Sequence, residues 1–121
     1  MAKYPKYVLL HNDRTDELFL KFGCVEFHKD LISESDKDDG WRCMGGGLFK
    51  PDFDRREIVL YGRSTDFGKP DSRLLKKAIE TFEDYSTISV LLYMMFESKY
   101  PNTGNIMDPI WDDNFKLVEE I

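Results

Sequence analysis

The sequence predicts a single α+β domain in which one sheet and a few helices share a core. A chain of 121 residues, 41% hydrophobic and 14% aromatic, is large enough for one such core. Short runs of β-branched and aromatic residues recur between turns rich in glycine and polar residues. One later segment combines a proline, a capping residue and an apolar stripe in the order that starts a helix.

The first third of the chain predicts two strands and a short helix. We expect a first strand at Lys6–Leu10, and a second at Glu17–Phe22, where an apolar run is broken only by Lys21. Gly23 is expected to end the second strand. Over Phe27–Ser35 the apolar residues recur at helical spacing, which places His28 in the first turn of a helix, on its apolar face. The acidic run Asp36–Gly40 would close that helix as a loop.

The middle third predicts a hairpin followed by the clearest helix of the chain. The stretch Trp41–Gly68 forms two apolar strands around a polar turn, with Glu57–Tyr61 as the returning strand. Pro70, Asp71 and Ser72 then start a helix. Its apolar stripe consists of Leu75, Ala78, Ile79 and Phe82.

The last third is less sharply patterned. Ser86–Phe96 favours a buried strand, although periodicity alone also allows a helix. Tyr100–Asn105 has the composition of a loop. We expect Ile106–Ile121 to end in a short helix from about Asn114, because apolar residues there recur at helical spacing.

Charge and cysteine content narrow the classes of partner. A formal net charge of −6 makes extended duplex nucleic acid a poor partner. No apolar run approaches the ~18 residues of a membrane helix, and the N-terminal apolar run is too short for a signal peptide. We therefore expect a cytoplasmic protein without a membrane partner. Cys24 and Cys43 form no CxxC pair and cannot hold a metal alone, which predicts free thiols.

Glycines give the strongest functional signal. Gly45, Gly46 and Gly47 interrupt a predicted strand, and each costs roughly 0.5–1 kcal/mol relative to alanine, so another group must approach the backbone there. The hydroxyl-bearing loop from Gly62 to Gly68 can turn several N–H groups toward an anion. We therefore expect a phosphate site on this loop, completed by a histidine from earlier in the chain.

His28 is the candidate for chemistry at that site. In the first turn of a helix, the positive end of the macrodipole disfavours the imidazolium and keeps the ring able to attack or to accept a proton. The alternative is a hydrogen-bonded core histidine, which is the commoner role for a lone histidine on an apolar stripe. His11 lies beside a turn without supporting features.

Other phosphate-handling motifs fail on spacing. Cys24 is followed six positions later by Asp30, where a cysteine-based phosphatase loop needs arginine. The run from Gly62 to Pro70 imitates a nucleotide-binding loop, but its glycines are one residue too far apart and proline replaces the magnesium-binding hydroxyl.

Four segments in register carry a family resemblance. They are KYVLL at Lys6–Leu10, EFHKDL at Glu26–Leu31, CMGGG at Cys43–Gly47 and VLYGRSTDFG at Val59–Gly68. In this order they resemble the small protein phosphohistidine phosphatases, the janus family, from Lys6 to about Met94. Residues 95–121 have no counterpart and would be a C-terminal extension of a single domain spanning residues 1–121.

The resemblance implies both a fold and an activity. The fold is a single mixed sheet flanked by helices. The activity is that of a phosphatase that needs no metal and no cofactor, and that hydrolyses the P–N bond of phosphohistidine in a protein or peptide substrate. A monomer is expected.

The resemblance also assigns roles to particular residues. His28 would be the catalytic residue, while Lys6 would help to bind phosphate and tune the histidine. The main chain around Ser64, Thr65 and Asp66 would cradle the phosphoryl group. Lys29 and Arg63 complete the set of candidate phosphate-binding residues. On the residues alone, Lys6 is equally a solvated strand-edge lysine, and the Ser64 hydroxyl equally shapes a turn.

Two departures from the family pattern keep a second function open. Leu48 follows the triple glycine, where many relatives carry a basic residue, and Arg63 would compensate from the other side of the site. The carboxylate of Asp66 would repel phosphate unless it points outward. The alternative is therefore a phosphate- or phosphopeptide-binding module that has lost turnover, and a weaker alternative is a purely structural domain.

Overall fold

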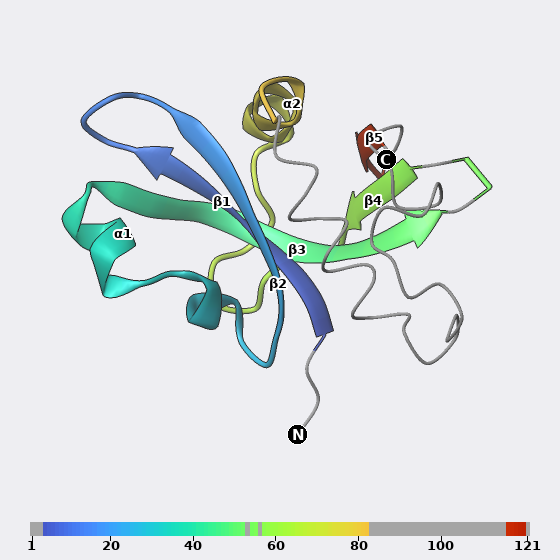
Figure 1. Cartoon of the computed structure of the whole chain (residues 1–121), viewed down its shortest axis with the longest axis horizontal. Helices are drawn as coiled ribbons and strands as arrows, with labels where there is room; N and C mark the ends of the chain where they lie inside the picture. The colour runs from blue at the N-terminus through green and yellow to red at the C-terminus, as the bar shows by residue number, and fades with distance from the viewer. Residues whose placement is uncertain (1–3, 53, 56, 83–115, 121) are drawn as a thin grey trace, which may run out of the picture.

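A five-stranded mixed sheet organises the protein (Figure 1). The computed structural model describes residues 4–52, 54–55, 57–82 and 116–120. The strands, in the spatial order β2-β1-β3-β4-β5, are β1 (Tyr4–Asn12), β2 (Leu18–Val25), β3 (Trp41–Asp52), β4 (Glu57–Tyr61) and β5 (Lys116–Glu119). Only the β4–β5 pair of this sheet is parallel. The predicted α+β class with a mixed sheet is confirmed.

Helices lie on both faces of the sheet. The 3₁₀ helix η1 (His28–Leu31) and the short helix α1 (Glu34–Asp38) pack on β1–β3, whereas α2 (Ser72–Glu80) packs on the opposite face (Figure 1). The faces carrying these helices are called the η1 face and the α2 face below. Within the described residues, no helix is both long and apolar enough to cross a membrane.

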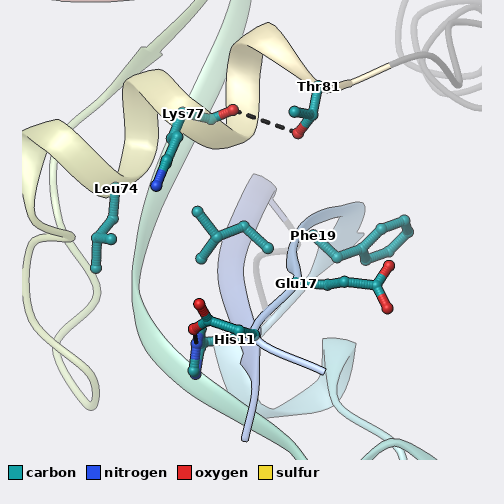
Figure 2. Close-up of a pocket in the computed structure, with 8 residues that line it drawn as sticks. His11, Glu17, Phe19, Leu74, Lys77 and Thr81 are labelled. Carbon is teal, nitrogen blue, oxygen red and sulfur yellow. Dashed lines mark hydrogen bonds and ion pairs between the residues drawn. The ribbon is translucent and has the colours of Figure 1, made fainter. Parts of the chain in front are cut away.

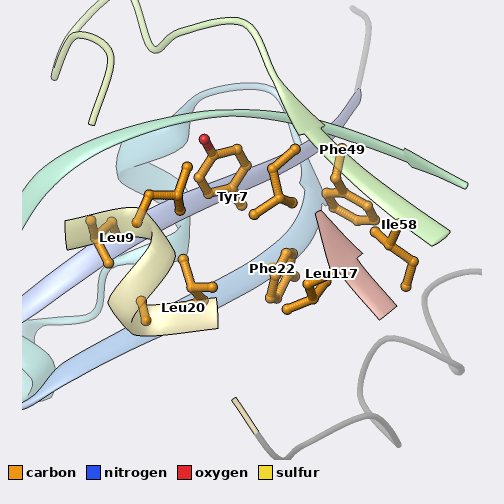
Figure 3. Close-up of a cluster of buried hydrophobic side chains, with 10 residues drawn as sticks. Tyr7, Leu9, Leu20, Phe22, Phe49, Ile58 and Leu117 are labelled. Carbon is orange, nitrogen blue, oxygen red and sulfur yellow. The ribbon is translucent and has the colours of Figure 1, made fainter. Parts of the chain in front are cut away.

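The alternation of β1 builds a core on each face. Tyr7 and Leu9 point toward α2 and belong to the larger core cluster, while Val8 and Leu10 pack with Leu31 of η1. In the larger cluster Phe22 meets Phe49 edge to face, with ring centroids 5.2 Å apart (Figure 3). Both faces of β1 are therefore buried, as expected for a central strand.

The predicted helix over Phe27–Ser35 is wrong in extent. The structure has two short helices instead, η1 and α1, separated by an extended Ser33. The Ser33 hydroxyl accepts from the Asp36 amide and the Asp36 carboxylate accepts from the Ser33 amide, so this capping box starts a new helix where periodicity predicted continuation. The acidic run predicted as a loop accordingly begins inside α1.

Two further boundaries differ from prediction. Gly23 does not end β2, because pairing with β1 continues through Gly23 to Val25. The glycine is needed for space, since a Cβ there would lie 2.7 Å from Cδ2 of Leu31. The C-terminal segment is the strand β5 and not a helix. Leu117 is 6% exposed in the core and Val118 pairs with Val59, so pairing with β4 overrides the helical spacing.

The other predicted elements agree with the structure where it describes them. The first strand is two residues longer at each end than predicted, the hairpin of β3 and β4 has the expected antiparallel register, and α2 begins after Asp71, whose carboxylate caps it. The elements predicted at Ser86–Phe96 and Tyr100–Asn105 lie outside the described residues.

Candidate functional site

The triple glycine lies where other backbone segments approach β3. A Cβ at Gly46 would sit 2.5 Å from the Tyr7 carbonyl oxygen and 3.0 Å from Cδ2 of His28. A Cβ at Gly47 would overlap the Tyr61 carbonyl oxygen, and one at Gly45 would meet the Pro70 backbone. The close approach predicted from the sequence is confirmed, and His28 is one of the approaching groups.

A β-bulge shapes the strand at the same point. The register between β1 and β3 shifts between Val8, which pairs with Gly46, and Leu10, which pairs with Cys43. Two residues of β3, Met44 and Gly45, thus oppose one residue of β1, and Gly45 has φ +132°. Bulges re-aim a strand locally, and this one lies directly before the two glycines that contact the site.

His28 is held by a hydrogen bond to the strand. The residue is 6% exposed, and its Nε2 lies 2.8 Å from the carbonyl oxygen of Gly47. Since a carbonyl oxygen only accepts, Nε2 carries the proton and donates it. In a neutral ring, Nδ1 therefore has the free lone pair. A helix dipole was predicted to act on the ring, but η1 is only a four-residue 3₁₀ turn. The contact that the structure does show, to the Gly47 carbonyl, determines which nitrogen of a neutral ring carries the proton.

Lys6 lies on the same face of the sheet as His28. Within β1 it alternates with Val8, which packs in the η1-face core. Its ammonium donates to the carbonyl of Glu26, two residues before His28 in the chain. A lysine ammonium has three N–H donors, so this contact leaves two for another acceptor.

The Gly62–Gly68 loop is bonded to the same glycines. Ser64 is 1% exposed; its amide donates to the Gly46 carbonyl at 2.9 Å, and its hydroxyl accepts from the Phe67 amide at 3.1 Å. Ser64 therefore shapes the loop, and its own amide is already used. Within the described part of the chain, the amides of Thr65 and Asp66 make no hydrogen bond. These two N–H groups are the donors that the loop leaves open.

Gly46 brings together two of the predicted site residues, His28 and Ser64. The His28 ring lies over Gly46. The Gly46 amide donates to the Gly68 carbonyl, and the Gly46 carbonyl accepts from the Ser64 amide. Arg63, Thr65 and Asp66 are exposed on that loop. Lys29 is exposed as well, with its ammonium 5.3 Å from the centroid of the Phe27 ring.

Three cavities lined by described residues do not include His28 in their linings. Cavities of about 480 and 490 Å³ both border α2, on the opposite face of the sheet from His28. Figure 2 shows the first of them, with Leu74 and Lys77 of α2 and the following Thr81 on one side and His11 and Glu17 on the other. A third, of about 200 Å³, is lined in part by Tyr7, Gly62 and Lys69.

Neither cysteine is placed as a nucleophile. Cys24 and Cys43 are both partly buried free thiols, and burial raises the pKa of each. Cys43 contacts the Gly45 carbonyl at 3.4 Å. Among the described residues, no three His, Cys, Asp or Glu side chains are grouped so as to hold a metal ion.

His11 sits between two carboxylates at the turn joining β1 and β2. Its Nδ1 is 3.1 Å from Asp13 and its Nε2 is 2.6 Å from Asp16. When both carboxylates are ionised they only accept, so both ring nitrogens must donate and the arrangement favours the imidazolium. The hydrogen bonds to Asp16 and then to Asp13 raise the pKa of His11.

This contact predicts a pH-dependent stability. A raised pKa in the folded state stabilises the protein fully below the unfolded value of about 6.5, and the contribution is lost as the pH rises through the folded value. We expect Tm to fall between pH 6 and pH 9, with a smaller fall in His11→Gln, measured by thermal denaturation. Equal falls in the two proteins would contradict the paired imidazolium.

The fold and the site define a class of protein: a small α+β domain with a histidine set against a glycine-bearing strand and an amide-lined loop. The chain belongs to the Janus/Ocnus family, because the sequence profile of that family (Ocnus) matches residues 5–88. Membership of the janus family, predicted from the four sequence segments, is thereby confirmed, and the phosphohistidine phosphatase activity stays a prediction. No protein with a curated description matches this chain.

Two contributions to the site were missed in the sequence. The Gly47 carbonyl holds His28 and the Glu26 carbonyl holds Lys6. Both are backbone groups, and no sequence pattern marks which carbonyl will face a given side chain.

Proposed function

We propose that this protein is a phosphohistidine phosphatase that works without a metal ion, with His28 as the catalytic residue. The observation that carries the proposal is the hydrogen bond from Nε2 of His28 to Gly47, which leaves Nδ1 as the reactive nitrogen. Membership of the Janus/Ocnus family and the placement of Lys6 and the open loop amides support it.

The proposed reaction transfers the phosphoryl group from a substrate histidine to water. The P–N bond breaks, its electron pair stays on the substrate imidazole, and that nitrogen takes up a proton. A water oxygen finally bonds to phosphorus. Nδ1 of His28 acts in one of two ways, by attacking phosphorus to form a phosphorylated His28 that water then hydrolyses, or by taking the proton from an attacking water.

The surrounding groups would stabilise the phosphoryl oxygens. The two remaining N–H donors of Lys6 and the amides of Thr65 and Asp66 are suited to equatorial oxygens that carry negative charge in the transition state. A protonated imidazole is a good leaving group, so positioning and charge stabilisation supply most of the proposed catalysis.

A binding module without turnover is the second candidate. Two observations favour it: His28 is only 6% exposed, and the exposed Asp66 places a carboxylate on the phosphate loop. In this alternative the phosphopeptide would bind through Lys6 and the loop amides, while Nδ1 would not reach phosphorus.

One assay separates the two functions. The wild-type protein, treated with EDTA, is mixed at neutral pH with a phosphohistidine peptide, and inorganic phosphate is followed by phosphorus NMR. We expect release well above the spontaneous rate. A rise in Tm with the phosphopeptide but no release would support the binding module, and the absence of both effects would reject both functions.

A further inference from the structure

A strip of the η1 face beyond His28 is built from alternating residues of β3 and β4. Leu48 is the cross-strand partner of Lys6 on one side and of Tyr61 on the other. Lys50 follows on the same face and is the partner of Val59. Cross-strand partners share a face, so Lys6, Leu48 and Tyr61 form one row across three strands. We call Leu48, Lys50, Val59 and Tyr61 the β3–β4 strip.

The described helices pack away from this strip. Both η1 and α1 lie on β1–β3, while α2 covers the opposite face. Leu48, Val59 and Tyr61 are each only partly buried, and Lys50 is exposed. The strip thus offers apolar surface that continues directly from the Lys6 row of the candidate site.

Lys50 has a fixed position and an available charge. Its ammonium lies 4.6 Å from the centroid of the Tyr61 ring, a cation–π arrangement that holds the side chain over the strip. Within the described ranges, no carboxylate lies within ion-pair distance of it. The nearest acidic cross-strand pair, Asp52 and Glu57, lies two residue pairs beyond Lys50 and Val59, at the end of the hairpin.

We propose that the β3–β4 strip binds the polypeptide that flanks the phosphohistidine, and that Lys50 selects an acidic side chain on it. This inference rests on the proposed function. Lys50 is three residues along β3 from Gly47, the anchor of His28, or roughly 10 Å at about 3.3 Å per residue. An extended substrate therefore brings its third residue from the phosphohistidine to Lys50, while the residues between them lie on Leu48 and Tyr61.

The test compares phosphohistidine peptides that differ at one position. Each peptide carries Glu or Lys three residues before or after the phosphohistidine, and kcat/KM is measured for each. For one of the two positions, we expect wild type to prefer Glu about three- to fivefold, as for an exposed charge pair. Lys50→Gln is expected to remove the preference and Lys50→Glu to reverse it, whereas Lys76→Glu on α2 matches the charge change and should keep it. The preference should weaken with added salt.

The outcomes separate the strip from the chemistry. Equal kcat/KM for all four peptides in wild type, with turnover intact, would overturn the strip and leave the phosphatase standing. If no peptide is hydrolysed, the proposed function fails, and the Kd values of the same peptides for wild type and Lys50→Glu then test the strip alone. If wild type and Lys50→Glu each bind all four peptides with the same Kd, the proposal for the β3–β4 strip is overturned.

Discussion

His28→Gln is expected to abolish phosphate release while leaving the protein folded. The glutamine side chain carries a terminal N–H donor that can replace Nε2 in the hydrogen bond to the Gly47 carbonyl, now 2.8 Å long. It has no counterpart of the Nδ1 lone pair. The variant therefore removes the proposed reactive atom and keeps the proposed anchor. Phosphate release at neutral pH measures the loss, and thermal denaturation measures the fold.

Two other variants make this result specific. His28→Ala is expected to lose the same activity and also about 1–3 kcal/mol of stability, because it leaves the buried Gly47 carbonyl without its partner. The chain's other histidine supplies a matched control, since His11 lies on the α2 face and His11→Gln should keep full turnover. Turnover at a wild-type rate in His28→Gln would show that Nδ1 takes no part in the reaction.

The parts of the fold that could be predicted are those set by local patterns. α2 has proline, a capping aspartate and an apolar stripe in sequence, and it forms where those signals place it. The segment Lys116–Glu119 has no such signals, and its identity as β5 depends on pairing with Glu57–Leu60, which lie more than fifty residues earlier in the chain. Long-range pairing of this kind leaves no mark at the segment itself.

The candidate site was predictable to a similar degree. Three consecutive glycines in a strand require close backbone approach. The sequence therefore predicts where the site lies, but not which groups approach the glycines. That the neighbours are the His28 ring and the carbonyls of Tyr7 and Tyr61 follows from the bulge at Gly45 and from the path of η1. Both are tertiary features. The Ser64 loop differs from the prediction in one respect. Ser64 was expected to offer its amide to phosphate, but that amide donates to the Gly46 carbonyl.

Gly47→Ala is expected to lower the free energy of unfolding by about 3 kcal/mol, at the upper end for overpacked sites. The added Cβ would overlap the Tyr61 carbonyl oxygen and approach the Tyr7 ring at 2.9 Å. Both neighbours belong to paired strands, so neither can move without disturbing the sheet. Such a loss corresponds to a fall in Tm of roughly 12 °C for a domain of this size. Denaturant titration gives the free energy and calorimetry gives Tm.

Gly68→Ala separates crowding from backbone conformation. Gly68 has φ +78°, which an alanine adopts at a cost of about 1 kcal/mol, but no atom lies within 4 Å of the position its Cβ would take. Gly47 has the opposite character, with crowding but no positive φ. If crowding by β4 and β1 is the reason for the triple glycine, Gly47→Ala must cost clearly more than Gly68→Ala. The Gly47 carbonyl also holds His28. Gly47→Ala should therefore lose phosphate release even at temperatures where the variant remains folded.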